Sequence, residues 1–328
     1  MPELRKDPID GRWVIIATER ARRPGNIVDS TQYPIDTNKE HCPYCKGDEK
    51  PIYTHGNIKV IPYRAVQTDL NIHRVEYGLY EILHGTGVYE IVVETDQHIA
   101  NMADFDEAQI REVLKTYAAR MHEFSKNSDL KYILAYKNHG ISAGSRNVGH
   151  ARSHVIATPV NPLRVKEKLI GAKEYFEAQG RCIYCDLIKQ EVEAKVRIVH
   201  ETEHFLAIVP FAARFLFELI ILPKKHQCDF IGGIQGMEDD LAHMLKTILM
   251  KFKKGLGDPS YNYVIQTAPL RGVGTDSHKW KTIEQDYHWH IELMPRISRF
   301  AGFEKGTEFY INSIPPEDMA EYLKGIEI

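Results

Sequence analysis

Two sets of cysteine and histidine residues repeat along the chain, and each set has the composition of a zinc site. Each set begins with a Cys-x-x-Cys pair, continues with a single histidine, and ends with a histidine that opens a polar triplet. The two sets are Cys42, Cys45, His98 and His150, and Cys182, Cys185, His226 and His288. Two thiolates and two imidazoles are ligands that a four-coordinate tetrahedral zinc ion prefers. The sequence therefore predicts two zinc ions per chain.

A redox pair is the main alternative for a Cys-x-x-Cys motif. A glutaredoxin-like pair needs a compact parallel βαβ unit around it. Cys42 and Cys45 instead lie in a turn-rich region, with Asn38–His41 before them and Lys46–Asp48 after them. The second Cys-x-x-Cys pair also has two histidines of its own, which makes a chance grouping of cysteines and histidines a poor explanation. Cys228 is the one cysteine of five outside a pair, and we interpret it as a plain small residue.

The last histidine of each set begins a triplet of alternate residues. The triplets are His150, Arg152 and His154 in the first half, and His288, His290 and Glu292 in the second. Residues two apart on a strand point to the same face. A metal ligand and a phosphate-facing group would therefore lie side by side. The alternative is that the members without a metal role are only polar surface residues.

Both halves contain the elements needed to position these residues. A strand precedes the single histidine of each set, at Tyr89–Glu94 and at Phe217–Leu222. A helix with apolar residues at helical spacing then follows, from Asp104 in the first half and from Glu238 in the second. Further strands are predicted at Tyr132–Tyr136, Val155–Thr158, Phe205–Val209, Tyr263–Gln266 and His288–Met294. Each half is therefore an α+β module, a mostly antiparallel sheet with one long amphipathic helix.

The join between the two modules is predicted after Pro159–Pro162, where a charged, helix-like segment, Leu163–Gln179, begins. We expect an N-terminal domain at residues 1–165, with the first zinc and the substrate site, and a C-terminal domain at residues 166–328, with the second zinc. The chain of 328 residues is long enough for each domain to have its own core.

Composition and charge exclude several classes of function. A hydrophobic content of 43% and a charged content of 27% are ordinary for a globular protein. The net charge of −3 gives no basic field, so no nucleic-acid partner is expected. The N-terminus has no apolar signal segment, and the longest apolar stretch, Phe215–Leu222, is short and interrupted by Glu218, so no membrane association is expected. Paired cysteines then favour metal binding in a cytoplasmic, reducing setting.

Several long motifs resemble the galactose-1-phosphate uridylyltransferase family, a branch of the histidine-triad superfamily. The matching segments are Leu4–Ile15, Arg20–Pro24, Gly87–Glu90, Lys137–Gly140, Ala143–Gly144, His288–His290, Gly302–Thr307 and Tyr310–Asn312. They cover nearly the whole chain, and the paired Cys-x-x-Cys motifs resemble those of two-zinc members such as ADP-glucose phosphorylase. The resemblance implies two pseudo-symmetric histidine-triad-like domains, and a homodimer with active sites near the subunit interface.

The same resemblance implies a nucleotidyltransferase that works in two steps. In the family, a histidine attacks the α-phosphorus of a nucleotide sugar or a similar nucleoside-phosphate ester, and a phosphate acceptor then removes the nucleotide. Arg20 and Arg23 match arginines that hold substrate phosphates, a task that suits guanidinium groups. Asn138 matches a residue that lies against the α-phosphate. The turn that holds the sugar and its phosphate here contains Phe303, Glu304, Gly306 and Thr307.

The first triplet departs from the family pattern, which is His-x-His-x-Gln. His150 keeps the position of the metal ligand, but Arg152 stands at the position of the nucleophile and His154 at that of the glutamine. Arginine stays protonated and has no lone pair with which to attack phosphorus. Other substrate-facing positions also differ from the common family residues, namely Tyr63, Tyr89 and Asn147.

Three explanations for this altered site stay open. In the first, Arg152 stabilises the phosphorus during direct displacement by the acceptor. In the second, His154 or His290 is the nucleophile, although intact family members also carry the His-Trp-His of the second half, which favours a structural His290. In the third, the site is catalytically silent and binds a nucleotide or a sugar phosphate.

The motifs do not separate a uracil substrate from an adenine substrate. The leading prediction is an enzyme that resembles hexose-1-phosphate uridylyltransferases, with a mechanism altered at Arg152. The alternatives are adenylyl transfer or phosphorolysis, with ADP-glucose or adenylyl sulfate as the donor, and a silent binding protein.

Overall fold

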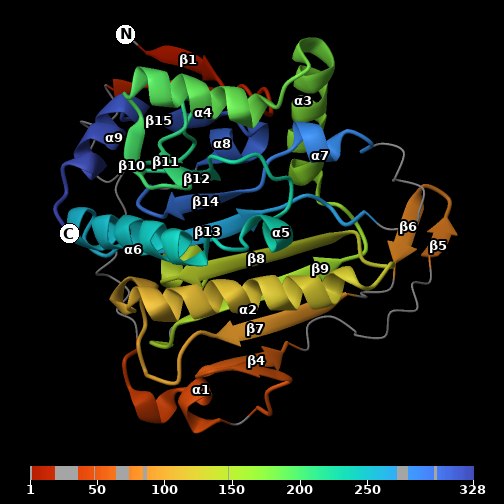
Figure 1. The fold of residues 1–328 in the computed structure, drawn as a ribbon, viewed down its shortest axis with the longest axis vertical. Helices are drawn as coiled ribbons and strands as arrows, with labels where there is room; N and C mark the ends of the chain where they lie inside the picture. Colours follow the sequence, from red (N-terminus) through yellow and green to blue (C-terminus); the bar gives the residue numbers. More distant parts are fainter. Residues whose placement is uncertain are drawn as a thin grey trace.

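A ten-stranded sheet runs through both halves of the chain, and all of its paired strands are antiparallel (Figure 1). The computed structural model describes residues 2–18, 36–47, 49–63, 74–83, 87–146, 148–271, 280–298 and 301–328. Among these residues, no helix combines the length and the apolar character that a membrane crossing requires. The α+β architecture expected from the sequence is confirmed.

The sheet consists of two equivalent five-stranded units joined edge to edge. The first unit contributes, in spatial order, β3 (Tyr53–His55), β4 (Ile58–Pro62), β7 (Val88–Val93), β9 (Arg152–Thr158) and β8 (Tyr132–His139). The second contributes, in the corresponding order, β10 (Ile198–Glu201), β11 (Phe205–Ile208), β12 (Leu219–Pro223), β14 (His290–Pro295) and β13 (Tyr261–Gln266). β8 and β13 pair at the centre, where Tyr136 lies opposite Val264. The duplication seen in the sequence is therefore also a duplication of topology.

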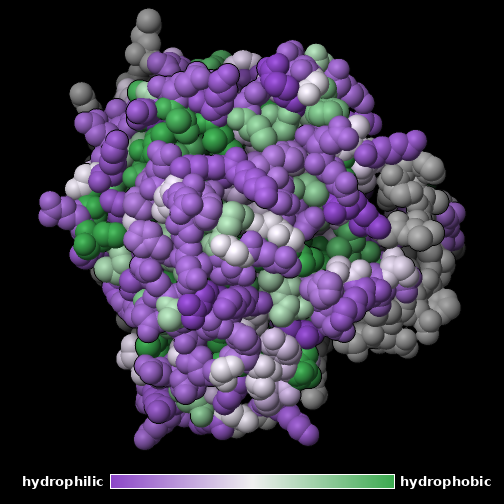
Figure 2. Space-filling view, viewed as in Figure 1, coloured by the Kyte–Doolittle hydropathy of each residue, from purple (hydrophilic) through white to green (hydrophobic). Residues whose placement is uncertain are grey.

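Each unit carries one long helix on the same side of the sheet. These helices are α2 (Glu107–Ser125), after β7, and α6 (Glu238–Gly255), after β12. They pack against each other and bury the apolar faces expected from their spacing, including Val113 of α2 and Leu245 of α6. Figure 2 shows a mainly hydrophilic surface on this side, because the helices turn their apolar residues toward the sheet.

The opposite face of the sheet is covered unevenly. The helices over the second unit are α3 (Leu163–Gln179), α4 (Ile183–Ala194) and α7 (Ile283–Asp286). Beneath them, strand residues such as Ile220 and Glu292 are buried. On the same face of the first unit, Tyr136 and His154 stay half-exposed. Among the described residues, the first unit therefore has an accessible sheet face around Tyr136 and His154, and the second unit has none at the corresponding place.

Smaller elements complete the described fold. They are a three-stranded sheet of β1 (Glu3–Lys6), β2 (Trp13–Ile16) and β15 (Tyr310–Asn312), a hairpin of β5 (Arg74–Tyr77) and β6 (Tyr80–Leu83), helices α1 (Pro43–Lys46), α5 (Phe230–Gly233), α8 (Gly302–Thr307) and α9 (Pro316–Lys324), and 3-10 turns at Lys39–His41, Met102–Asp104 and Ile141–Ala143. The boundary expected at residues 165/166 falls inside α3. Because one sheet and one core contain residues of both halves, the division into two domains stays a prediction.

Candidate functional site

The first set of predicted metal ligands gathers at one end of β7 and β9. Cys42 and Cys45 lie at the start of α1, His98 follows β7, and His150 precedes β9. The Cys45 Sγ atom lies 3.3 Å from Nδ1 of His98 and 3.4 Å from Nδ1 of His150. Cys42 Sγ lies 3.5 Å from the same His150 nitrogen. All four ligand atoms are within 4.8 Å of one another.

The second set forms the same arrangement at the corresponding end of β12 and β14. Cys182 and Cys185 lie at the start of α4, as the first pair does at α1. Cys185 Sγ lies 3.3 Å from Nδ1 of His226 and 3.8 Å from Nδ1 of His288. These four ligand atoms are also within 4.8 Å of one another. The structure thus brings the eight predicted ligands together as two clusters of four.

Backbone carbonyl groups orient three of the histidine rings toward the thiols. The hydrogen bonds from Nε2 to a carbonyl oxygen are His150 to Thr95 (2.9 Å), His226 to Glu284 (3.0 Å) and His288 to Pro223 (2.8 Å). A carbonyl oxygen can only accept, so each bond places the ring proton on Nε2. The lone pair of Nδ1 is then left facing the cysteines, as a metal ligand requires.

The dimensions of both clusters fit zinc. Bonds of about 2.3 Å to sulfur and about 2.0–2.1 Å to nitrogen, at tetrahedral angles, separate the sulfur and nitrogen atoms by about 3.6 Å. The closest sulfur–nitrogen separations here run from 3.3 to 3.8 Å. A glycine is required beside the first cluster, because a Cβ atom on Gly149 would lie 2.4 Å from the Asp36 carbonyl oxygen and 3.3 Å from Nε2 of His98.

Arg152 directs its guanidinium group into the loop that precedes β9. Its four described hydrogen bonds run to Oγ of Ser145 (2.8 Å) and to the carbonyl oxygens of Arg146 (3.2 Å), Val148 (3.3 Å) and His150 (3.2 Å). The group also lies over the ring of Tyr44, 5.5 Å from its centroid, beside the first cysteine pair. Arg152 is 6% exposed. Its charge is therefore held in one place by the loop.

His154 lies next along the accessible face and is framed by two tyrosines. Its ring stacks on Tyr136 with centroids 5.0 Å apart, and the edge of Tyr89 approaches at 5.6 Å. The two tyrosine hydroxyls hydrogen-bond each other at 2.6 Å. Burial, and then the nearby charge of Arg152, lower the pKa of His154 to about 4, so its ring is neutral near pH 7. Among the described residues, no group hydrogen-bonds its buried Nδ1 atom.

Tyr136 is a residue of this face that the motifs did not indicate. Tyr136 lies two residues before Asn138 on β8, so the alternation of side chains along a strand would have placed it on the same face as Asn138.

Asn138 contacts the second unit, because its Oδ1 accepts a hydrogen bond from Nδ2 of Asn262 on β13 (2.7 Å). A small cavity of about 10 Å³ next to Asn138 is also lined by Arg146 and Arg152. Residues of β8, β9 and the loop before β9 thus meet at one place.

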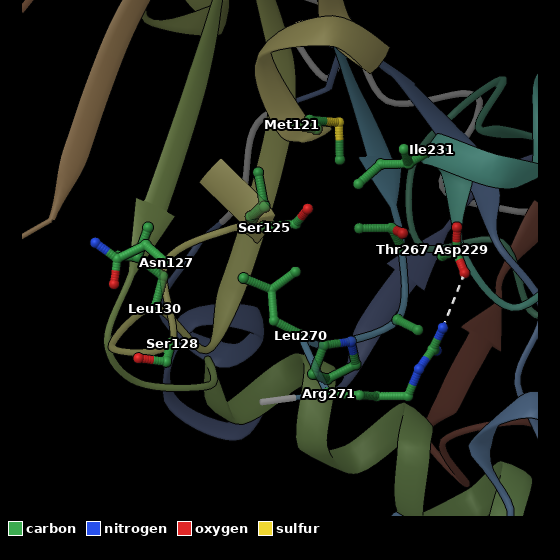
Figure 3. Close-up of a pocket in the computed structure, with 13 residues that line it drawn as sticks. Met121, Ser125, Asn127, Ser128, Leu130, Asp229, Ile231, Thr267, Leu270 and Arg271 are labelled. Carbon is green, nitrogen blue, oxygen red and sulfur yellow. Dashed lines mark hydrogen bonds and ion pairs between the residues drawn. The ribbon is translucent and has the colours of Figure 1, made fainter. Parts of the chain in front are cut away.

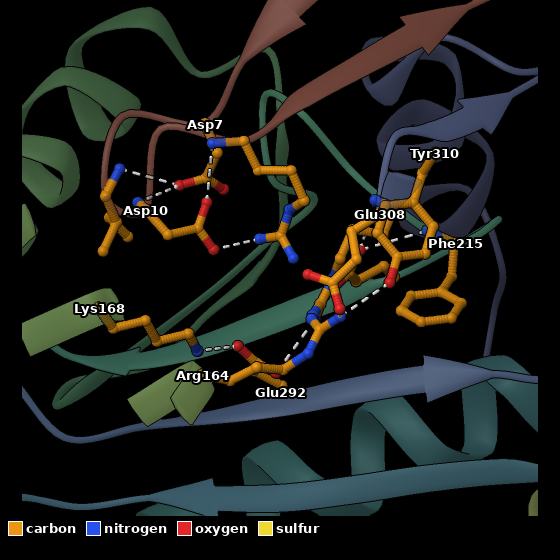
Figure 4. A network of polar contacts seen from close by, with 12 residues as sticks. Asp7, Asp10, Arg164, Lys168, Phe215, Glu292, Glu308 and Tyr310 are labelled. Carbon is orange, nitrogen blue, oxygen red and sulfur yellow. Dashed lines mark hydrogen bonds and ion pairs between the residues drawn. The ribbon is translucent and has the colours of Figure 1, made fainter. Parts of the chain in front are cut away.

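His290 holds the middle position of the second triplet, but it is closed off. It is 1% exposed, and its Nδ1 donates a hydrogen bond to the His288 carbonyl (2.9 Å). Lys168 of α3 lies 3.2 Å from its Nε2 and also pairs with Glu292 (Figure 4), which Arg214 contacts at 3.1 Å. This placement favours a structural role for His290 over a nucleophilic one.

The predicted sugar-phosphate turn forms α8, beside β15 and away from β9 within one chain (Figure 1). Phe303 is 47% exposed, and Gly306 is also exposed. Glu304 accepts a hydrogen bond from the Ala301 N–H (3.0 Å), and the Thr307 hydroxyl donates to the Phe303 carbonyl (2.7 Å). The structure therefore does not bring this turn to the first triplet. Three other predicted residues, Arg20, Arg23 and Asn147, lie outside the described residues.

A larger cavity, of about 340 Å³, opens on the α2 side of the sheet (Figure 3). Met121 and Ser125 of α2 line it, together with Thr267 and with Arg271, which pairs with Asp229 at 3.1 Å. None of its lining residues was predicted as a site residue. The cavity is therefore separate from the candidate site.

Comparisons with known proteins cover the whole chain. The ADP-glucose phosphorylase of Arabidopsis thaliana is 34% identical over 341 aligned residues, which cover 100% of this chain and 93% of the relative. The galactose-1-phosphate uridylyltransferase of Thermotoga maritima is 28% identical, over 100% of this chain and 99% of the relative. A crystal structure of an Arabidopsis thaliana ADP-glucose phosphorylase with bound ADP-glucose matches with a TM-score of 0.80, 33% identity and full coverage of both chains.

A family model agrees with these relatives. The model of the galactose-1-phosphate uridyl transferase C-terminal domain matches residues 168–299, which include the second cysteine pair, His226 and the second triplet. The family expected from the sequence motifs is confirmed. The chain therefore belongs to the galactose-1-phosphate uridylyltransferase family of nucleotidyltransferases.

Proposed function

We propose that this chain transfers a nucleoside monophosphate from a nucleotide sugar to a phosphate acceptor on the accessible face of the first unit. The observation that carries the proposal is the grouping of Asn138, Arg152 and His154 there, beside the first Cys/His cluster. The equivalent face of the second unit is filled by Lys168 and the rest of α3. Within the part of the chain that the structure describes, the triplet of the first unit is therefore the more accessible to a substrate.

ADP-glucose is the donor that we favour, with inorganic phosphate as the acceptor. The relative that shares 34% identity over the full chain is an ADP-glucose phosphorylase, and a solved structure of similar fold contains bound ADP-glucose. Uridylyl transfer is the second candidate, because the Thermotoga maritima uridylyltransferase also aligns over the full chain.

In this proposal Arg152 is a fixed cation and the acceptor itself attacks. The hydrogen bonds to the loop hold the guanidinium charge in place before substrate binds. A preorganised charge stabilises the negative charge that develops on a transferring phosphoryl group without further rearrangement. An acceptor oxygen forms a bond to the α-phosphorus, the bond to the sugar phosphate breaks, and its electron pair leaves with the sugar 1-phosphate.

Zinc in both clusters and a homodimer belong to the same proposal. Zinc would tie α1 to β7 and β9, and α4 to β12 and β14. A second copy of the chain would supply α8, with Phe303 and Thr307, to the accessible face, because α8 lies away from that face within its own chain. Cysteine thiolates that bind zinc also suit a reducing compartment such as the cytoplasm.

The test is turnover of a small panel of donors by the zinc-loaded protein. The mixtures are ADP-glucose with phosphate, UDP-glucose with galactose 1-phosphate, and adenylyl sulfate with phosphate, each followed by phosphorus NMR. We expect phosphate-dependent formation of ADP and glucose 1-phosphate, inversion at the α-phosphorus, and no nucleotide bound covalently to the protein. Label on His154 would replace direct displacement by a two-step route. Nucleotide binding without turnover of any donor would contradict the proposed function.

A further inference from the structure

A buried network of charges and hydroxyl groups lies beneath β9, on the α2 side of the sheet. Lys137 of β8 and Glu94 form an ion pair at 2.5 Å, with side chains that are 1% and 0% exposed. The hydroxyl of Tyr117 on α2 lies 3.1 Å from a Glu94 carboxylate oxygen, 2.6 Å from the Ser153 hydroxyl and 2.5 Å from the Tyr263 hydroxyl. The network therefore joins both units and the long helix of the first.

Two contacts connect this network to the candidate site on the other side of the sheet. The Lys137 ammonium donates a hydrogen bond to the backbone carbonyl of Arg152 (3.1 Å). Glu94 immediately precedes Thr95, whose carbonyl accepts the Nε2 proton of His150 (2.9 Å). The same ion pair thus sits next to the start of β9 and next to the carbonyl that orients a proposed zinc ligand.

Stability alone is a weak reason for such a pair. Two charges that leave water lose hydration, and this loss largely cancels their attraction, so apolar residues of similar size often serve a fold equally well. Buried polar networks that are fully hydrogen-bonded instead specify one arrangement of the backbone around them. Here the specified backbone is the segment that carries Arg152, and His154 follows it on the same strand.

We propose that the Glu94–Lys137 pair positions Arg152 and His154 for the transfer reaction. Glu94 and Lys137 are therefore both positioning residues. The inference rests on the proposed function for its kinetic readout. From beneath the sheet the pair holds the carbonyl of Arg152, while the loop holds the guanidinium group on the other face. A displacement of about 1 Å at a reacting group can lower a rate by about 100-fold.

The variant that tests this role is Glu94→Leu combined with Lys137→Met, which removes both charges and keeps most of the side-chain volume. The matched control is Glu191→Leu combined with Arg197→Met, which removes another buried pair, 2.8 Å apart, in the second half of the chain. We expect both double variants to stay folded and to bind two zinc ions. Only the first is expected to lower kcat, by about 10- to 100-fold, with a smaller change in KM.

Stability measurements separate positioning from simple structural support. The single variant Lys137→Met is expected to melt at a lower temperature than the double variant, because it leaves the Glu94 carboxylate buried and unpaired. If the double variant does not fold, Glu94→Gln combined with Lys137→Met takes its place, since it removes both charges and keeps a polar group beside the Tyr117 hydroxyl. A folded network variant with the kcat of the wild type would overturn the inference.

The rate of zinc release can be measured without substrate, so it tests this inference separately from the proposed function. If the wild-type protein turns over no donor, the proposed function fails, and zinc release decides the role of the network. The Glu94/Lys137 double variant is then expected to lose zinc from the first cluster to a chelator about tenfold faster than the control variant, because the carbonyl that orients His150 is less well held. Equal release rates in the two variants would overturn the inference.

Discussion

Arg152 changes the chemistry of its site in two ways. It places a permanent positive charge at the position where the sequence resemblance predicts the attacking imidazole of the family, and its guanidinium group donates hydrogen bonds to the Ser145 hydroxyl and the His150 carbonyl. Burial, and then the charge of Arg152, lower the pKa of His154, so the neighbouring imidazole stays neutral near pH 7. The site therefore combines a fixed cation with an uncharged histidine beside it.

His139 allows a pH test at the scale of one residue. Its ring is 5% exposed, and burial, followed by the charge of Lys137, lowers its pKa to about 3. An unfolded chain binds a proton at this histidine below about pH 6.5, whereas the folded protein does not until about pH 3. The stability that comes from the neutral ring is therefore fully present above about pH 6.5 and is lost as the pH falls toward about 3.

The measurement is urea unfolding of the wild type and of His139→Gln at pH 7, 5.5 and 4.5. The wild type is expected to lose up to about 1.4 kcal/mol more per pH unit than the variant in this range, because only the wild type has this ring to protonate on unfolding. Acid loss of zinc would affect both proteins alike. Parallel curves for the two proteins would contradict the assignment of a neutral, buried His139.

At the scale of elements, α3 makes the two units different. The units share strand order, helix placement and a Cys/His cluster, yet among the described residues only the second unit has a helix that places a lysine beside its triplet. Lys168 and Arg214 together neutralise Glu292, and the three groups fill the space around His290. The second unit therefore keeps the Cys/His cluster, which includes His288, while His290 and Glu292 of its triplet are enclosed by α3.

Replacing Lys168 with methionine tests this division of roles. The variant leaves Glu292 buried with Arg214 as its remaining partner, so we expect stability to fall by about 3 kcal/mol in urea unfolding. Turnover measured below the unfolding transition should keep the wild-type kcat. The control is Lys173→Met on the same helix, whose exposed pair with Glu177 is worth about 0.5 kcal/mol or less. A loss of kcat in a folded Lys168 variant would assign the second unit a part in the reaction.

At the scale of the whole molecule, two Cys/His clusters lie at equivalent corners of one continuous sheet. Elemental analysis of the purified protein should return two zinc ions per chain. Cys45→Ser and Cys185→Ser should each retain one, because each removes one thiolate of one cluster. Cys228→Ser is the matched control and should retain both, since Cys228 belongs to neither cluster. One zinc ion or none in the wild-type protein would contradict the paired sites.

Periodic and repeated features of the fold could be predicted from the sequence. The helical spacing around Val113 and Leu245 predicted α2 and α6, and the repeated cysteine pairs predicted the two clusters. The apolar pattern of β9 begins only at Val155, so the prediction that Arg152 and His154 lie on a strand depended on their alternation with His150. The strand begins at Arg152 because pairing with β7 sets Arg152 opposite Val93.

Contacts between residues far apart in the chain also could not be predicted from the sequence. The Glu94–Lys137 pair and the Lys168–Glu292 pair join segments that share no local pattern. The charge of Arg152 could be read from its residue type, but its acceptors belong to a loop whose path depends on the first cluster. The closed face of the second unit likewise depends on where α3 packs, which periodicity does not reveal.

The most direct test of the central claim is where the α-phosphorus lies in crystals of the zinc-loaded protein soaked with ADP-glucose in the absence of phosphate. We expect it over β9 of the first unit, beside Arg152 and Asn138, with the side opposite the sugar phosphate open to an acceptor. An α-phosphorus bound over the second unit would contradict this account. So would one with a ring nitrogen of His154 in line for attack at about 3.5 Å.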